Sequence, residues 1–321
     1  MRIGLDVMGG DYAPQQTVAG AVNACHQFNP SNRIVLIGPS QLIEDELANL
    51  HCDCRLFDIV DASENIEMHD NPVKAFELKP DSSIVKGFKM LASGEIDGFA
   101  SVGNTGAMMV GAMQVIKPAR GVIRPCISSV YPNVQGGNSL FLDVGLNADS
   151  KPEMLLQFAQ IGSVFSELVF RCNHPKVGLL NIGSEPGKGN LLSKSAYELL
   201  SNNKQINFIG NVEANQLFDA AIVDVIVTDG FVGNILLKQA EGFYELMKKR
   251  NISDSYFDKY NFELYGGTPV LGINKSVVIG HGRSSAKAIE SMLLQTERIV
   301  EVNLCEEIIK FMSHDKNQSF N

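Results

Sequence analysis

The sequence predicts an α/β protein with a largely parallel sheet flanked by helices. Short runs rich in β-branched residues alternate with segments whose apolar residues recur every three or four positions, which is typical of repeated βα units. The 321 residues are 45% hydrophobic and include 29 glycines. The chain can therefore bury a sizeable core, and it has enough glycine for many tight turns.

The expected elements follow this alternation. Strands are predicted where apolar runs are bounded by glycine or polar turn residues, at residues 2–7, 33–37, 55–60, 97–102, 126–130, 139–144, 176–182, 206–209, 223–228 and 276–279. Helices are predicted where apolar residues form one stripe, at residues 14–27, 41–49, 82–92, 106–116, 152–170, 191–201, 233–249 and 285 to about 312.

No internal repeat, low-complexity tract or linker divides the chain. We expect a single catalytic domain over residues 1–321, and two tightly joined lobes remain an open alternative. The opening residues have no basic region followed by a long apolar core, so no signal peptide is expected and the location is predicted to be cytoplasmic.

The charge balance limits the partners. The net charge is −9 and the pI is about 5.2. Because a duplex-binding protein normally needs a dominant basic face, nucleic acid is not an expected partner. The cysteines are scattered and the histidines dispersed, so no metal and no cofactor are expected.

Six predicted strands end in a polar turn that contains glycine, at residues 5–11, 101–106, 142–147, 181–190, 228–234 and 280–285. Turns that follow parallel strands lie along one edge of the sheet, where ligands bind in open α/β folds. Glycine lets the backbone approach a ligand, and the start of the next helix presents unpaired N–H groups to an anion. A phosphate-bearing ligand is therefore the favoured hypothesis, although purely structural turns would look partly similar.

These turns supply the candidate site residues. The candidates for binding phosphate or substrate are Asp6, Gly9, Gly10, Asp11, Gly103, Thr105, Gly106, Asn147, Asn181, Gly183, Asp229, Gly233, Asn234 and Arg283. The candidate catalytic residues are Asn104, Lys188 and His281. His281 is either an acid, base or phosphate contact or a cap of the following helix, and the sequence does not separate these roles.

Several familiar motifs are absent. Residues 183–189 resemble a P-loop but are one residue short, and Gly189 replaces the magnesium-binding Ser or Thr. No dinucleotide fingerprint and no G-x-S-x-G elbow is present. Transfer of an activated acyl group to inorganic phosphate needs neither a protein nucleophile nor a strong base, since phosphate is already an anion. Positioning and oxyanion stabilisation would suffice, and the turn residues can supply both.

Taken together, the motifs resemble those of the acyl-carrier-protein-dependent phosphate acyltransferases (the PlsX family). The matching segments are residues 5–11, 101–107, 181–183, 213–215, 228–234, 265–267 and 281–282, in order and over nearly the whole chain. The resemblance implies an isocitrate-dehydrogenase-like architecture and an enzyme that makes acyl phosphate from acyl-carrier protein and inorganic phosphate for phospholipid synthesis. It also implies a homodimer.

The chain departs from the family pattern at three places. Leu146 stands where a small residue is usual, Ser184 and Pro186 flank Glu185 where consecutive glutamates are favoured, and Arg283 often has a small counterpart. Lys188 is retained, so a cation facing phosphate remains plausible.

Aromatic residues gather between residues 243 and 265, around Lys248, Lys249 and Arg250. Rings interleaved with cations suit either a membrane interface or a dimer contact, and the resemblance favours peripheral membrane association, with a membrane glycerol-phosphate acyltransferase as a further partner. The acidic carrier protein would need a local basic patch. Three clusters are candidates: Lys86 with Lys89, Lys117 with Arg120 and Arg124, and residues 248–250.

Two other functions fit the same turns. One is a coenzyme-A-dependent phosphate acetyltransferase, and the other is a non-catalytic scaffold that binds carrier protein at the membrane. A dehydrogenase is disfavoured, since the usual glycine fingerprint is absent, but it stays an open alternative because relatives of this architecture bind nicotinamide without that fingerprint.

Overall fold

The computed structural model describes residues 1–134, 137–218 and 222–318. The chain forms two compact units. Unit 1 comprises Met1–Pro118 and Phe262–Cys305, and unit 2 comprises Ala119–Asn261 and Glu306–Asn321. No composition shift marks the boundary, because each unit is assembled from separate stretches of the chain.

Unit 1 is built on six strands in the order β3-β2-β1-β4-β11-β10. All neighbours are parallel except β10 and β11, which are antiparallel. The strands are β1 (Arg2–Asp6), β2 (Arg33–Gly38), β3 (Asp58–Asp61), β4 (Gly98–Ser101), β10 (Thr268–Leu271) and β11 (Ser276–Ile279). The helices are α1 (Gln15–Cys25), α2 (Ser40–Asn49), α3 (Pro72–Leu78), α4 (Ser83–Ser93), α5 (Thr105–Val110) and α9 (Ala286–Glu301).

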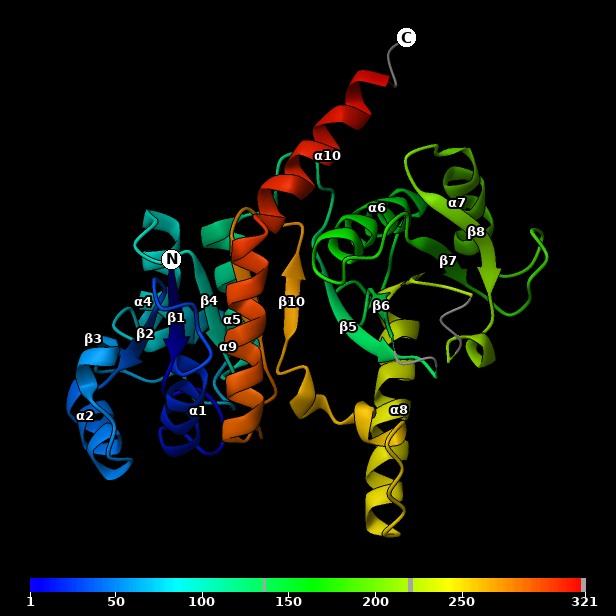
Figure 1. Cartoon of the computed structure of the whole chain (residues 1–321). Coiled ribbons are helices and arrows are strands. Elements are labelled where there is room, and N and C mark those ends of the chain that lie inside the picture. The colour runs from blue at the N-terminus through cyan, green and yellow to red at the C-terminus, as the bar shows by residue number, and fades with distance from the viewer. Residues whose placement is uncertain (135–136, 219–221, 319–321) are drawn as a thin grey trace. The chain divides into compact units, whose positions relative to one another are not determined.

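Helices cover both faces of this sheet. Successive side chains of a strand point to opposite faces. In β4, Gly98 lies against Thr296 of α9, whereas the ring of the next residue, Phe99, packs on Phe88 of α4 with the ring centroids 5.2 Å apart. α1 and α9 lie side by side on the first face (Figure 1).

In unit 2 the described residues form five strands in the order β5-β6-β9-β7-β8. β5 and β6 form an antiparallel pair, and the other neighbours are parallel. The strands are β5 (Cys126–Pro132), β6 (Asn138–Leu142), β7 (Lys176–Leu180), β8 (Asn207–Val212) and β9 (Val225–Val227). The helices are α6 (Pro152–Leu168), α7 (Leu191–Asn202) and α8 (Gly230–Lys249), and α10 (Leu304–Gln318) ends the described chain.

The faces of the second sheet follow the same alternation. Leu142 and Val225 lie against Gly162 of α6. Their neighbours Phe141 and Ile226 belong to a buried cluster on the opposite face, against which residues of α8 pack. Both units therefore have the helix-covered, largely parallel sheet that the sequence predicts.

Three differences from the expected elements concern short segments. β10 was not expected, because it is short and contains Pro269, which breaks a strand pattern. α3 was also missed, although Asn71 caps it and Pro72 opens it. The segment 106–116 continues from α5 into a π-helical turn, Gly111–Ile116.

The single long helix expected from residue 285 to about 312 is wrong. α9 ends at Glu301, and α10 begins at Leu304. Between them Asn303 has φ 51°, a left-handed conformation that asparagine tolerates better than most residues. The apolar stripe continues across the break, since Leu304, Ile308 and Met312 are buried, and periodicity alone therefore could not reveal it.

Candidate active site

Three of the six glycine-containing turns meet in unit 1. β1, β4 and β11 are parallel neighbours, so their carboxyl ends share one edge of the sheet. The backbone N–H of Gly280 donates to the Ser101 carbonyl oxygen (2.8 Å), and the N–H of Asp11 donates to the Gly282 carbonyl oxygen (2.7 Å). These bonds make the three turns one connected structure.

The buried carboxylate of Asp6 links two of these turns through hydrogen bonds. It is 1% exposed and accepts hydrogen bonds from the Ser101 hydroxyl (2.6 Å) and the Met8 N–H (3.1 Å). The Ser101 hydroxyl oxygen in turn accepts from the Gly103 N–H (2.9 Å). Burial raises the pKa of the Asp6 carboxyl, and the hydrogen bond from Ser101 opposes that rise. Asp6 therefore shapes the turns and is not itself exposed to a ligand.

Other residues of the same three turns face solvent. Asp11, Thr105, His281 and Arg283 are all exposed. Gly10 has φ +87°, which brings the first turn close to Gly282. Among the predicted site residues of unit 1, these groups can meet a ligand from solvent.

The structure settles one alternative for His281. α9 is capped by Ser285, whose side chain accepts from the Ala288 N–H. The alternative in which His281 caps this helix is therefore excluded. Its Nδ1 instead accepts from the Arg283 N–H at 3.3 Å, within the turn.

Asn104 has a positioning role that the sequence did not indicate. It is 5% exposed, and its Oδ1 caps α5 by accepting from the Ala107 N–H. Its Nδ2 donates to the carbonyl oxygens of Glu67 (3.0 Å) and Asp70 (3.1 Å). Asn104 thus fixes the segment before α3 onto the β4 turn, where Gly106 lies against Pro72.

The other three turns lie in unit 2 and follow the parallel neighbours β6, β9 and β7, so they share one edge of the sheet. The turn after β6 contains the Asp143 carboxylate, which is fully buried. It accepts from the backbone N–H groups of Ile127 (3.1 Å), Leu146 (3.3 Å) and Asn147 (2.6 Å) and from Nδ2 of Asn147 (2.9 Å). Burial raises the pKa of the Asp143 carboxyl, and the backbone bond from Ile127 is the largest opposing cause.

The start of α8 is tied to this carboxylate turn. The Gly230 N–H donates to the Asn147 carbonyl oxygen (2.8 Å). Asp229 caps α8 by accepting from the Val232 N–H (2.9 Å), so its carboxylate is engaged by backbone. Gly233 lies directly against the Asp143 carbonyl, and the side chain of Asn234 lies beside Gly145.

The turn after β7 carries a cation. The ammonium of Lys188 lies 3.9 Å from the Glu185 carboxylate, and half of its side chain is exposed. Asn181 supports this turn by donating from Nδ2 to the Lys188 carbonyl oxygen (3.2 Å) and to Oδ1 of Asn211 (3.0 Å). Gly183 packs against the Lys188 side chain.

Sequence reasoning missed the organising roles of Ser101 and Asp143, although both lie within the turns that it identified. A signal was present. Asp6 is the last residue of an apolar strand and Asp143 directly follows one, and a glycine stands three or two residues further on. A buried acceptor at a strand end is one way to satisfy the N–H groups of a glycine turn.

Comparison with solved structures places the fold. EutD phosphotransacetylase from Staphylococcus aureus is similar with a TM-score of 0.64 at 15% identity, over 94% of each chain. A phosphotransacetylase from Streptococcus pyogenes gives 0.65 at 18% identity over 94% of each chain. A 4-hydroxythreonine-4-phosphate dehydrogenase from Burkholderia phymatum gives 0.52 at 13% identity, over 94% of this chain and 98% of that one. At these identities the likeness concerns the fold.

Sequence comparison identifies the family. The phosphate acyltransferase of Dictyoglomus turgidum is 42% identical over 97% of each chain. That of Clostridioides difficile is 38% identical over 100% of this chain and 99% of its own. The family model described as fatty acid synthesis protein matches residues 1–307. The chain, with its two sets of strand-end turns, therefore belongs to the fatty acid synthesis protein family.

Proposed function

We propose that this protein is an enzyme, a phosphate acyltransferase that transfers the acyl group of acyl-carrier protein to inorganic phosphate for phospholipid synthesis. The observation that carries the proposal is the nearly full-length similarity to proteins named phosphate acyltransferase. The strand-end turns support it, because backbone N–H groups, cations and hydroxyls at such edges are suited to a phosphate.

The reaction needs little from the protein beyond positioning. An oxygen of phosphate attacks the thioester carbonyl carbon, the new C–O bond forms, and the C–S bond breaks. The electron pair of that bond leaves on the carrier thiolate, which then takes a proton from solvent. Because phosphate is already a nucleophile, the main contributions are holding the reactants together, about 7–11 kcal/mol, and stabilising the oxyanion, about 3–4 kcal/mol per donor.

The turns suggest a division of roles. In unit 2, the half-exposed ammonium of Lys188 is the proposed phosphate or oxyanion contact. In unit 1, His281, Arg283 and Thr105 are exposed and are proposed to contact substrate. Asn104, Asp6 and Asp143 are buried and are proposed to position these groups.

The first test measures thiol release. Wild-type protein with palmitoyl-acyl-carrier protein and phosphate should release the free carrier thiol, and acetyl-coenzyme A should be a poor donor. Lys188→Ala and His281→Ala should each lower kcat/KM by about 10²-fold, the range for losing one oxyanion donor, with unchanged unfolding curves because both side chains are exposed.

Three results would contradict this assignment. The absence of phosphate-dependent release with any donor would exclude the acyltransferase. A preference for acetyl-coenzyme A would favour the acetyltransferase. If the protein bound carrier protein but showed no turnover, and if neither variant weakened that binding, a scaffold would be favoured.

We also propose a homodimer that associates peripherally with the membrane. No helix in residues 1–134, 137–218 and 222–318 is both long and apolar enough to span a bilayer. Near the cationic end of α8, however, Leu246, Ile252 and Phe257 are 50%, 48% and 40% exposed. Apolar side chains beside Lys248–Arg250 suit an anionic lipid surface.

A vesicle assay tests the membrane contact. Wild-type protein should sediment with vesicles that contain anionic phosphatidylglycerol, and sedimentation should weaken in high salt because the attraction is partly electrostatic. Leu246→Ser with Phe257→Ser should reduce sedimentation several-fold at unchanged charge. Equal sedimentation of both proteins would remove this segment from the contact.

A further inference from the structure

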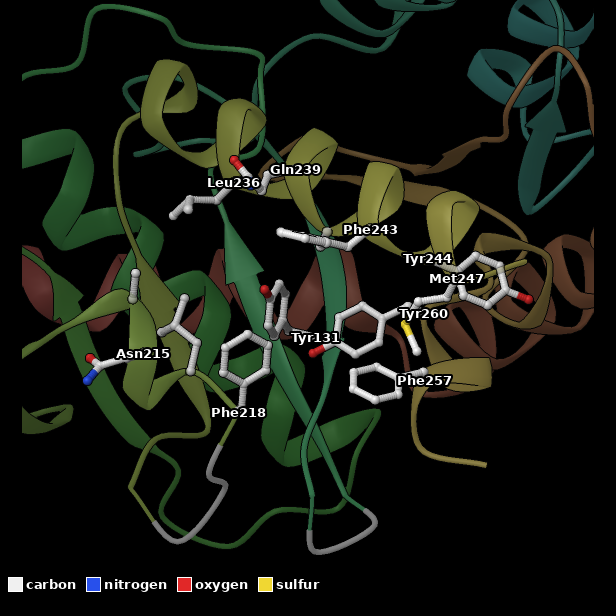
Figure 2. A pocket seen from close by; sticks show the side chains of 13 residues that line it. Tyr131, Asn215, Phe218, Leu236, Gln239, Phe243, Tyr244, Met247, Phe257 and Tyr260 are labelled. Atoms are coloured by element: carbon white, nitrogen blue, oxygen red, sulfur yellow. The ribbon is translucent and has the colours of Figure 1, made fainter. Parts of the chain in front are cut away.

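A cavity of about 440 Å³ lies in unit 2, beside α8. Figure 2 shows aromatic rings grouped below the helix, with Phe243 and Met247 on the side of α8 that faces them. The rings belong to Tyr131, Phe218, Phe257 and Tyr260. The volume is within the range of about 300–1,000 Å³ that small-molecule sites occupy.

No charged side chain is among the described residues that line the cavity. Its residues are aromatic, aliphatic or sulfur-containing, apart from the amides of Asn215 and Gln239. Burial raises the pKa of Tyr131 to about 12, and it also raises the pKa of Tyr260, so these hydroxyls stay protonated. A neutral, apolar occupant is therefore favoured, since a charged group would lose its hydration without gaining a partner.

Hydrogen bonds hold part of the cavity wall in place. The hydroxyl of the lining residue Tyr260 donates to the Pro132 carbonyl oxygen (3.4 Å), and so does that of its neighbour Tyr256 (3.2 Å). The rings of Tyr131 and Tyr260 pack edge-on with centroids 5.4 Å apart. In contrast, Phe243 and Phe257 are 57% and 40% exposed, although both line the cavity. An apolar occupant would remove these rings from water, which is favourable.

The cavity runs along the helix whose first turn belongs to the candidate active site. α8 begins at Gly230, and the first lining residue on it is Leu236. At about 1.5 Å of rise per residue these positions are roughly 9 Å apart along the axis, and Leu236 and Met247 are roughly 16 Å apart. The lining residues of α8 are thus spread along the helix, from Leu236 near its start to Met247 near its end.

One motif of the sequence also lies here. Ala214 and Asn215, from the segment 213–215, line the cavity but contact none of the six turns through a hydrogen bond that the described residues show. Ala214 and Asn215 therefore form part of the cavity wall.

We infer that this cavity binds the hydrocarbon chain of the acyl donor, with the thioester toward the start of α8 and the chain end toward Met247. The inference rests on the proposed function. The cavity holds more than ten times the roughly 30 Å³ that one water occupies in the liquid. An acetyl group would leave most of it unfilled, whereas a long acyl chain supplies an apolar body of suitable length.

The test is a variant that fills the cavity. Ala240 lines it from α8, so Ala240→Trp should exclude part of the chain. Each methylene left in water costs about fourfold in affinity. We expect kcat/KM for palmitoyl-acyl-carrier protein to fall at least tenfold, and kcat/KM for butyryl-acyl-carrier protein to stay within about twofold. Gly242→Trp is the matched control, because nothing lies within 4 Å of its Cβ position and it does not line the cavity.

The outcomes separate the two proposals. If wild-type protein turns over neither donor, the proposed function fails. If it is active and Ala240→Trp keeps the wild-type ratio of the two donors, the cavity does not hold the chain. An equal loss for both donors, with a change of oligomeric state by sedimentation velocity, would instead identify the cavity as an interface with a second copy and overturn the inference. Should Ala240→Trp fail to fold, Phe243→Ala must lower the same ratio, since it removes an exposed ring from the lining.

Discussion

Replacing Asp143 by alanine is expected to lower the free energy of unfolding by about 3–5 kcal/mol and to abolish acyl transfer. The fully buried carboxylate accepts from the N–H groups of Ile127, Leu146 and Asn147. Alanine would leave these donors unsatisfied in the interior, at about 1–3 kcal/mol each before relaxation. Because the same turn anchors the start of α8 through Asn147 and Gly230, the loss should extend to the active site. Urea unfolding and thiol release measure the two effects.

Asp229→Ala is the matched control. Asp229 also follows a strand and also accepts a backbone hydrogen bond, but it is half-buried and serves as the cap of α8. Loss of such a cap typically costs about 1 kcal/mol. Equal destabilisation by the two variants would mean that Asp143 is no more than a turn acceptor, and our account of unit 2 would be wrong.

Local patterns predicted most of the fold. The alternation of apolar runs and amphipathic segments identified the strands of both sheets except β10. A strand covered by helices on both faces is apolar along its length, and a helix on the surface has apolar residues on one side only. The failures share a cause. Each missed feature depends on a single residue: β10 contains Pro269, the break between α9 and α10 lies at Asn303, and α3 begins after its cap Asn71. A pattern averaged over many positions does not detect one residue.

The site was predictable as a set of turns but not as a set of roles. Glycine and polar residues after the strands identified the turns at the carboxyl edge of each sheet. They could not show that Asn104 and Asp229 are engaged as helix caps, nor that Asp6 is buried beneath the turns. Such roles depend on contacts between residues distant in sequence, such as the bond between Asp6 and Ser101.

Replacing Gly233 by alanine is expected to have the second large effect, because α8 closely approaches the turn at residues 142–147 there. A Cβ at Gly233 would meet the Asp143 carbonyl oxygen, with the carbonyl carbon only 3.0 Å away. Gly233→Ala should therefore push the first turn of α8 outward and cost about 1–3 kcal/mol of stability, as overpacking does. It should also lower kcat/KM by about 10²-fold, because a displacement of about 1 Å at a reacting site has that effect.

The same helix offers the control for this substitution. Gly242 is exposed, and nothing lies within 4 Å of its Cβ position. Gly242→Ala should therefore keep wild-type activity and raise stability by up to about 1 kcal/mol, since alanine is the better helix former. Both variants make the same chemical change in one helix and differ in what the new methyl group meets. If Gly233→Ala and Gly242→Ala had the same stability and activity, the start of α8 would be free to move. The Asp143 turn would then not position this helix.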